Sequence, residues 1–117
     1  MHEMAIAASL LEIAEVEAKA QNCMKLRRLT VHYGQISGIM PEALELAFAA
    51  LVAGTPHEGA KLDLVMLPLR LKCPFCQTVF SGADSIFVPC PTCGEEFGHH
   101  IEQGKELLLA RLEADPS

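Results

Sequence analysis

The chain has 117 residues, half of them hydrophobic, and carries a formal net charge of −6 at pH 7. This length suits one modest domain, or one domain that carries a small lobe. The negative charge argues against a nucleic-acid partner, because proteins that bind phosphates are basic. No apolar run is long enough to cross a membrane, and the first residues lack the basic region of a signal peptide. We therefore predict a protein without a membrane partner.

Apolar periodicity predicts four elements in the first part of the chain. Residues 4–22 have helix-forming composition and an apolar stripe. Residues 29–33 alternate and are rich in β-branched residues, which predicts a strand. Pro41 fits the first turn of a second helix over 41–53, and Leu62, Leu64 and Met66 alternate in a second strand. The stripe of the first helix is expected to contain Ile6, Ala7, Leu10, Leu11, Ile13, Ala14 and Ala18.

The order helix, strand, helix, strand suggests a βαβ unit with an extra leading helix, in which the two strands are parallel. Residues 105–113 are ambiguous, because their composition favours a helix whereas strand pairing would place Leu108, Ala110 and Leu112 on one face. Residues 115–117 are expected to form a frayed tail.

Four cysteines occur in two C-x-x-C pairs between residues 70 and 104, namely Cys73, Cys76, Cys90 and Cys93. Two residues between cysteines let one turn aim both sulfurs at a single ion, and a second turn completes a tetrahedral thiolate shell that suits zinc. Gly94 lets the backbone leave the second turn. A closed shell of this kind is structural, so the function must lie elsewhere.

Three alternatives to zinc remain at this point. Two disulfides would need an oxidising compartment, and a thioredoxin-like site would need only one pair. A rubredoxin-type iron site has similar ligands, and spacing alone does not exclude it. A thiolate-rich metal site together with the absence of a signal peptide predicts a reducing cytoplasm. The fifth cysteine, Cys23, is expected to be a small buried hydrophobe.

The N-terminus offers a second group of metal ligands. The Met1 amine, the His2 amide and the His2 imidazole can form adjacent chelate rings, and Glu3 adds a carboxylate or a further amide. Nitrogen-rich tetragonal coordination favours Ni(II) or Cu(II) over zinc. The first amides of a helix have no intrahelical acceptor, so deprotonating one breaks no ladder bond. A histidine at position 2 can equally be a solvated terminal residue.

Several short motifs together resemble one known family along almost the whole chain. The segments are Met1-His2-Glu3-Met4, His32-Tyr33-Gly34, Ile36-Ser37, Pro41-Glu42-Ala43-Leu44, Ala47-Phe48, Gly54-Thr55, Glu58-Gly59-Ala60-Lys61-Leu62, the two cysteine pairs and Gly104-Lys105-Glu106-Leu107. This combination is similar to the hydrogenase nickel-incorporation metallochaperones of the HypA/HybF family. The resemblance covers both candidate metal sites.

The resemblance implies an α+β fold, with a small mixed three-stranded sheet, two helices and an inserted zinc-ribbon-like loop lobe. Residues 105–113 would then form the third strand. A nickel-binding domain would span 1–69 and 105–117, and a zinc-binding domain 70–104. The implied nickel ligands are His2 with the N-terminal backbone and Glu3 nearby, and the implied zinc ligands are the four paired cysteines.

The function implied is delivery of Ni(II) to the large subunit of [NiFe]-hydrogenase, with a HypB-like GTPase as partner and a homodimer left open. We therefore expect a metallochaperone and no enzyme. The alternatives are a zinc-ribbon interaction module of another assembly and an oxidoreductase that uses the C-x-x-C pairs. His99 and His100 are expected to be solvated loop residues, or else a ligand that reaches one of the two metals. No role is assigned to His32 or His57.

Overall fold

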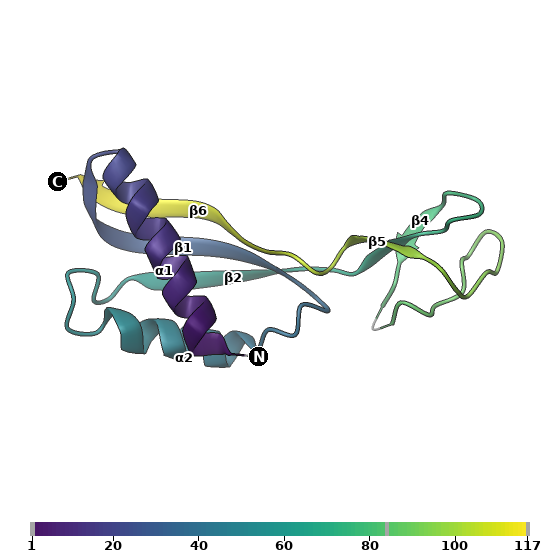
Figure 1. The fold of residues 1–117 in the computed structure, drawn as a ribbon, viewed down its shortest axis with the longest axis horizontal. Helices are drawn as coiled ribbons and strands as arrows, with labels where there is room; N and C mark the ends of the chain where they lie inside the picture. The colour runs from purple at the N-terminus through teal and green to yellow at the C-terminus, as the bar shows by residue number, and fades with distance from the viewer. Residues whose placement is uncertain (1, 84, 117) are drawn as a thin grey trace. The chain divides into compact units, whose positions relative to one another are not determined.

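The computed structural model describes residues 2–83 and 85–116. Over these residues the chain forms two helices and six strands, shown in Figure 1. In chain order they are α1 (Glu3–Ala20), β1 (Cys23–Gly34), α2 (Pro41–Val52), β2 (Lys61–Leu67), β3 (Arg70–Lys72), β4 (Val79–Ser81), β5 (His100–Gln103) and β6 (Leu107–Pro116).

The chain divides into two compact units, each assembled from separate stretches of sequence. The first unit consists of Met1–His32, Ile39–Val65 and Leu108–Ser117, and the second of Tyr33–Gly38 and Met66–Leu107.

The sheet of strands β1, β2 and β6 is mixed and has the order β2-β1-β6. Residue numbers rise together along the contacts between β1 and β2, which therefore run parallel, whereas they run in opposite senses between β1 and β6. The contacts on the β2 side join Arg28 to Asp63 and Gln35 to Leu67. Those on the β6 side join Arg28 to Glu113 and Gly34 to Glu106. The predicted α+β class with a mixed three-stranded sheet and two helices is confirmed.

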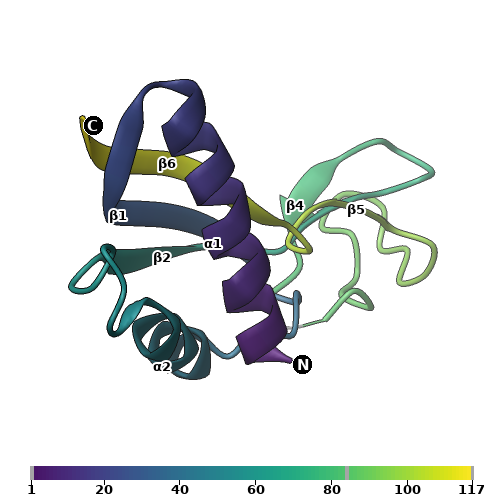
Figure 2. The ribbon, with the colours of Figure 1, turned by 60° about the vertical axis from the view of Figure 1, so that its left-hand side comes forward.

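Helix α1 lies across one face of the first unit's sheet (Figures 1 and 2). Its buried positions are spaced three or four residues apart, as one face of a helix requires. Three of the four are alanines, which let the helix lie close to its neighbours, and all four belong to one apolar cluster with residues of β1 and α2: Ala7, Leu10, Ala14 and Ala18. The prediction for Ile13 was wrong, because its side chain is 52% exposed at the margin of this stripe.

The ambiguous segment near the C-terminus forms strand β6 and not a helix. The prediction of a frayed tail was wrong for residues 115 and 116, because both belong to β6. Ser117 lies outside the described residues. The predicted apolar face was also wrong in part. Leu109 and Leu112 pack against the core, whereas Leu108 is 43% exposed. An odd spacing between two inward residues requires a local irregularity in the strand, which alternation alone cannot predict.

The second unit has its own small antiparallel sheet, with the order β4-β3-β5. Its buried cluster contains three apolar side chains, Leu69, Leu71 and Phe80, and two of the cysteines, Cys73 and Cys90. The rest of the unit is loops that connect these short strands. The thiols are therefore a large part of this unit's interior.

Candidate metal centre

The second unit brings the four paired cysteines together. Their sulfur atoms all lie within 4.8 Å of one another, and no other such group of three or more His, Cys, Asp or Glu side chains occurs over residues 2–83 and 85–116. Cys73 Sγ lies 3.5 Å from Cys93 Sγ, and Cys76 Sγ lies 3.5 Å from Cys90 Sγ. These separations are far longer than a disulfide bond, so the described thiols are free.

Two equivalent turns position the thiols. Gln77 N donates to Cys73 O at 3.0 Å in the first turn, and Gly94 N donates to Cys90 O at 2.8 Å in the second. The residue after each pair has a positive φ, 65° at Gln77 and 80° at Gly94. Glycine adopts this conformation without strain, which is why Gly94 was recognisable in the sequence. Gln77 occupies the matching position in the first turn, where sequence gave no such signal.

The cluster of four cysteines has the chemistry of a cation-binding site. Hydrogen bonding of its sulfur with the side chain and the backbone amide of Thr78 lowers the pKa of Cys76 from 9.0 to about 6. Although burial opposes ionisation of Cys90, the amides of Cys93 and Thr92 lower its pKa. Backbone amides therefore already stabilise negative charge on part of the group.

The surroundings of Cys93 oppose ionisation of its thiol. The Glu95 amide, the largest single influence, lowers the pKa of Cys93, but the neighbouring Cys73 thiol, burial and the other two thiols outweigh it and raise the pKa to about 12. Four thiolates this close repel one another, so full ionisation requires a cation among them. A tetrahedral zinc–thiolate shell places its sulfurs about 3.8 Å apart, given a Zn–S bond of about 2.3 Å. The observed separations fit that size.

The N-terminal residues predicted to bind nickel lie at the start of α1. His2 is the N-cap residue, and its carbonyl accepts from Ile6 N at 3.0 Å. Its imidazole makes no capping hydrogen bond. Glu3 Oε2 accepts a hydrogen bond from Met40 N at 3.3 Å, which joins the first turn of α1 to the N-cap of α2. The Met1 amine, which was predicted to join this group, lies outside the described residues.

His99 is not a solvated loop residue, so that prediction was wrong, whereas His100 is exposed at the start of β5. His99 Nε2 donates to Val88 O at 3.0 Å, and its ring meets Phe80 edge-on with centroids 5.0 Å apart. Its other ring nitrogen, Nδ1, is buried without a hydrogen-bond partner among the described residues.

His57 is a structural residue that sequence reasoning missed. It is 8% exposed, and its Nδ1 accepts a hydrogen bond from Leu26 N at 3.0 Å. Its Nε2 lies 3.2 Å from Glu15 Oε2 on α1. The ring therefore joins the loop before β2 to both β1 and α1. Its position in a turn rich in small residues gave no sign of this burial.

The metallochaperone resemblance is tested by comparison with known proteins. Residues 1–114 match the family described as hydrogenase/urease nickel incorporation, metallochaperone, hypA. The chain belongs to the HypA family. A hydrogenase maturation factor HypA from Lawsonia intracellularis is 35% identical over 98% of this chain and 100% of its own length. One from a Picosynechococcus species is 41% identical over 97% of this chain and 98% of its own.

Structural comparison agrees with the HypA assignment. The solution structure of the Ni metallochaperone HypA from Helicobacter pylori has a TM-score of 0.72 and 28% identity to this chain, and the match covers all of both chains. The family resemblance predicted from the short motifs is thus confirmed, and with it a role among nickel metallochaperones of hydrogenase maturation. Among the described residues, neither helix has the length and apolar content that a membrane span requires.

Proposed function

We propose that this HypA-family chain binds Ni(II) at its N-terminus and delivers it to the large subunit of [NiFe]-hydrogenase, with a HypB-like GTPase as partner. The ligands are the His2 imidazole and the N-terminal backbone nitrogens, with Glu3 nearby. The observation that carries this proposal is the position of His2 and Glu3 at the first turn of α1. Backbone amides there have no acceptor within the helix, so they are available to a metal.

The local charges support a cation that is held and then released. The positive end of the α1 dipole opposes a cation, and the Glu3 carboxylate in the first turn offsets part of that repulsion. The hydrogen bond from Met40 N holds the Glu3 side chain near the start of the helix. Tetragonal nitrogen coordination favours Ni(II) and Cu(II) over zinc. A delivery site of this kind is exchangeable, whereas four thiolates hold their ion firmly.

A structural zinc ion bound by Cys73, Cys76, Cys90 and Cys93 completes the proposal. Its support is the separation of the four sulfurs and the need for a cation to balance their charge. In domain terms, residues 1–69 and 105–117 bind nickel and residues 70–104 bind zinc, in the cytoplasm. Nothing in the proposed function requires catalysis by this chain.

A nickel titration of the zinc-loaded protein tests the N-terminal site. The parent should bind one Ni(II) per chain, and His2→Gln should lose that site while retaining zinc and the circular dichroism of both helices. His100→Gln is the matched control, because it removes an exposed imidazole elsewhere and should leave nickel binding unchanged. Nickel affinity should fall as pH falls, since imidazole, amine and amide must all lose protons. Equal nickel binding by His2→Gln and the parent would refute the assignment.

A further inference from the structure

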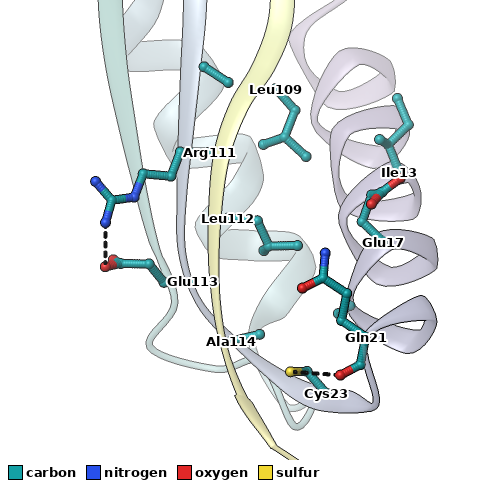
Figure 3. A pocket seen from close by; sticks show the side chains of 11 residues that line it. Ile13, Glu17, Gln21, Cys23, Leu109, Arg111, Leu112, Glu113 and Ala114 are labelled. Carbon is teal, nitrogen blue, oxygen red and sulfur yellow. Dashed lines mark hydrogen bonds and ion pairs between the residues drawn. The ribbon is translucent and has the colours of Figure 1, made fainter.

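The two units place their large apolar side chains differently. In a groove of about 610 Å³ within the first unit, Figure 3 shows Leu109 and Leu112 of β6 directed toward α1. Both leucines pack against the buried cluster of that unit. Arg111 and Glu113, which form an ion pair at 3.7 Å, point away from the helix. The first unit thus turns these apolar side chains inward, whereas the second unit exposes phenylalanines.

Three of the five phenylalanines of the chain are exposed, and all three belong to the second unit. Phe75 is 71% exposed, Phe87 is 61% exposed and Phe97 is 63% exposed, whereas Phe48 and Phe80 are buried. We call the three exposed rings the aromatic patch. Exposed apolar groups that gather in one place mark interaction sites, and aromatic side chains contribute most strongly to the energy of protein interfaces.

The members of the aromatic patch come from neighbouring loops. The rings of Phe87 and Phe97 meet edge-on, with centroids 6.2 Å apart. Phe75 lies on the adjoining turn, because its neighbour Pro74 is next to Gly98. A Cβ atom added at Gly98 would be 3.6 Å from the Pro74 ring. The turn that carries Phe75 therefore contacts the loop that carries Phe97.

Hydrogen bonds hold the aromatic patch in place before any partner binds. His99 Nε2 donates to Val88 O at 3.0 Å, which ties the loop after Phe97 to the loop of Phe87. The backbone amides of these two phenylalanines also donate to side chains two residues earlier in the chain, at 3.0 and 3.3 Å. A surface that is already ordered loses little conformational freedom when it binds.

The two cysteine turns support the same patch. Phe75 lies inside the first C-x-x-C pair, and Phe97 comes shortly after the second. Thr78 Oγ1 donates to Thr92 Oγ1 at 3.1 Å and so joins the two turns. An ion held by the four cysteines would fix both turns and, with them, the spacing of the exposed rings.

The segment that carries the aromatic patch is strongly acidic. From Cys73 to Gly104 the sequence contains no lysine or arginine, and it contains four acidic residues: Asp84, Glu95, Glu96 and Glu102. Two of these, Glu95 and Glu96, directly precede Phe97. A zinc ion bound by four thiolates remains anionic as a whole, so it adds to this negative charge.

This charge decides between the possible occupants of the aromatic patch. An anionic membrane, a nucleic acid and a second copy of this acidic segment would all be repelled. A segment that brings lysine or arginine beside its apolar side chains would be attracted and oriented. The surface therefore combines apolar anchors with a rim of fixed negative charge.

We propose that the aromatic patch docks a segment of a partner protein in which large apolar side chains are flanked by lysine or arginine. The proposal rests on the zinc part of the function proposed above and does not depend on nickel binding. It gives the second unit a role beyond holding an ion, because the ion shapes the surface that the partner contacts.

Selection from a display library of random dodecapeptides tests the docking surface on the zinc-loaded chain. The library is first depleted on the Phe87→Ser/Phe97→Ser variant, so that the peptides retained by the parent are those that need the patch. The enriched peptides should contain at least two large apolar side chains and more Lys and Arg than Asp and Glu. No enrichment, or an excess of acidic residues in the enriched peptides, overturns the proposal.

Fluorescence anisotropy of one enriched peptide measures the parts of the surface separately. Phe75→Ser, which was not used for depletion, should weaken binding by at least about fivefold, as expected for an interface side chain that contributes to affinity. Glu95→Gln/Glu96→Gln should weaken binding at low salt and remove most of its salt dependence, because rim charges act over long range. Binding that neither variant changes overturns the proposal.

The first unit supplies matched controls for both changes. Leu46 is 73% exposed on α2, so Leu46→Ser removes an exposed apolar side chain outside the patch. Glu12→Gln/Glu45→Gln removes the same charge as the double glutamate variant from exposed positions on the two helices. Both controls should bind the peptide like the parent. A control that weakens binding as much as the corresponding patch variant would show that the patch is not the site.

Hydrogen exchange on the parent protein locates the contact without any substitution. Amides of residues 85–98 should become more protected when the peptide is added, whereas those of α1 and β6 should not. Protection confined to the first unit would contradict the proposal. Vesicles of phosphatidylcholine and phosphatidylglycerol test the other class of occupant. If the parent sedimented with them and Phe87→Ser/Phe97→Ser did not, the patch would bind lipid and the proposed partner would be wrong.

Metal analysis of the same samples separates this proposal from the function proposed above. His2→Gln should bind the peptide like the parent. A zinc-loaded chain that enriches no peptide refutes the docking surface alone. Peptide binding by a parent that takes up no nickel refutes the nickel site alone.

Discussion

The two units of this chain are stabilised by different interactions. The first unit buries a cluster of eleven residues drawn from α1, α2 and β1, all of them hydrophobic. The second unit buries a cluster of five residues, and two of these are cysteines of the metal-binding group. Apolar burial of the first kind can stabilise a small sheet that is covered by helices. Burial of the second kind leaves a segment of short strands and loops with too little core to remain ordered alone.

Because of this difference, we expect only one of the two units to need a metal ion for its stability. We infer that the first unit forms without metal and that the second depends on the ion held by its cysteines. The proposed nickel site belongs to the first unit, so nickel can bind and dissociate without unfolding that unit. The following predictions test this contrast, in order of decreasing effect.

Replacement of a buried zinc ligand should have the largest effect. Cys73→Ser removes a side chain with no exposed surface, and it should abolish zinc binding and the protection of residues 66–107 against hydrogen exchange. Apparent zinc-binding energies of roughly 10–16 kcal/mol in zinc-finger peptides show how much order such a site can stabilise. Cys23→Ser, outside the group, is the matched control and should change neither property. A metal-free variant with an ordered second unit would contradict the contrast.

Truncation of the first unit's largest buried side chain should show the reverse pattern. Phe48 is 1% exposed, so Phe48→Ala should lower the free energy of unfolding of the first unit by about 3–5 kcal/mol. Urea unfolding followed by circular dichroism measures this, because both helices belong to that unit. Phe75 is 71% exposed, and Phe75→Ala should cost less than about 0.5 kcal/mol. Zinc content should stay at the parental level in both, and its loss in Phe48→Ala would show that the units are not independent.

Removal of the buried imidazole should have an intermediate effect on the first unit. His57→Ala leaves Leu26 N without its acceptor and should cost about 1–3 kcal/mol in the same urea experiment. His100→Ala removes an exposed imidazole and should have almost no effect. A loss no larger for His57→Ala than for His100→Ala would mean that this hydrogen bond does not stabilise the fold.

The smallest effect concerns protons released when zinc binds. All four cysteines must be thiolates in the complex, but hydrogen bonding with Thr78 already holds the pKa of Cys76 at about 6. Near neutral pH the metal-free chain should therefore release fewer than four protons per zinc. Because protons compete with the metal, zinc affinity should fall as pH falls. Calorimetry in buffers of different ionisation enthalpy counts the protons, and a count of four at pH 7 would be inconsistent with an ionised Cys76.

Local signals in the sequence predicted the elements and the thiol group well. Spacing places two thiols on each turn whatever the remainder of the fold does, so the grouping of the cysteines follows from it. The apolar stripe of α1 was predicted except for Ile13, which lies at its margin and is 52% exposed. The strand assignment of β6 came from family resemblance, because its composition favours a helix and only pairing with β1 overrides that preference.

Other features depend on contacts that a sequence does not display. The burial of His57 results from two partners, Leu26 and Glu15, that are distant in the chain. The inward position of His99 similarly depends on Phe80 and Val88. The positive φ of Gln77 is required by the turn and is unusual for its residue type. In each of these three cases, contacts in the folded chain determine a position or conformation that the local sequence does not predict.

Metal analysis of two forms of the protein tests the central claim most directly. One form has the native N-terminus, and the other carries one extra residue before Met1, which removes the chelating amine from its position beside His2. After exposure to excess nickel and removal of free metal, the native form should retain one zinc and one nickel per chain. The extended form should retain one zinc and lose the nickel. Equal nickel in both forms would contradict an N-terminal site, and loss of both metals from the extended form would contradict the independence of the two sites.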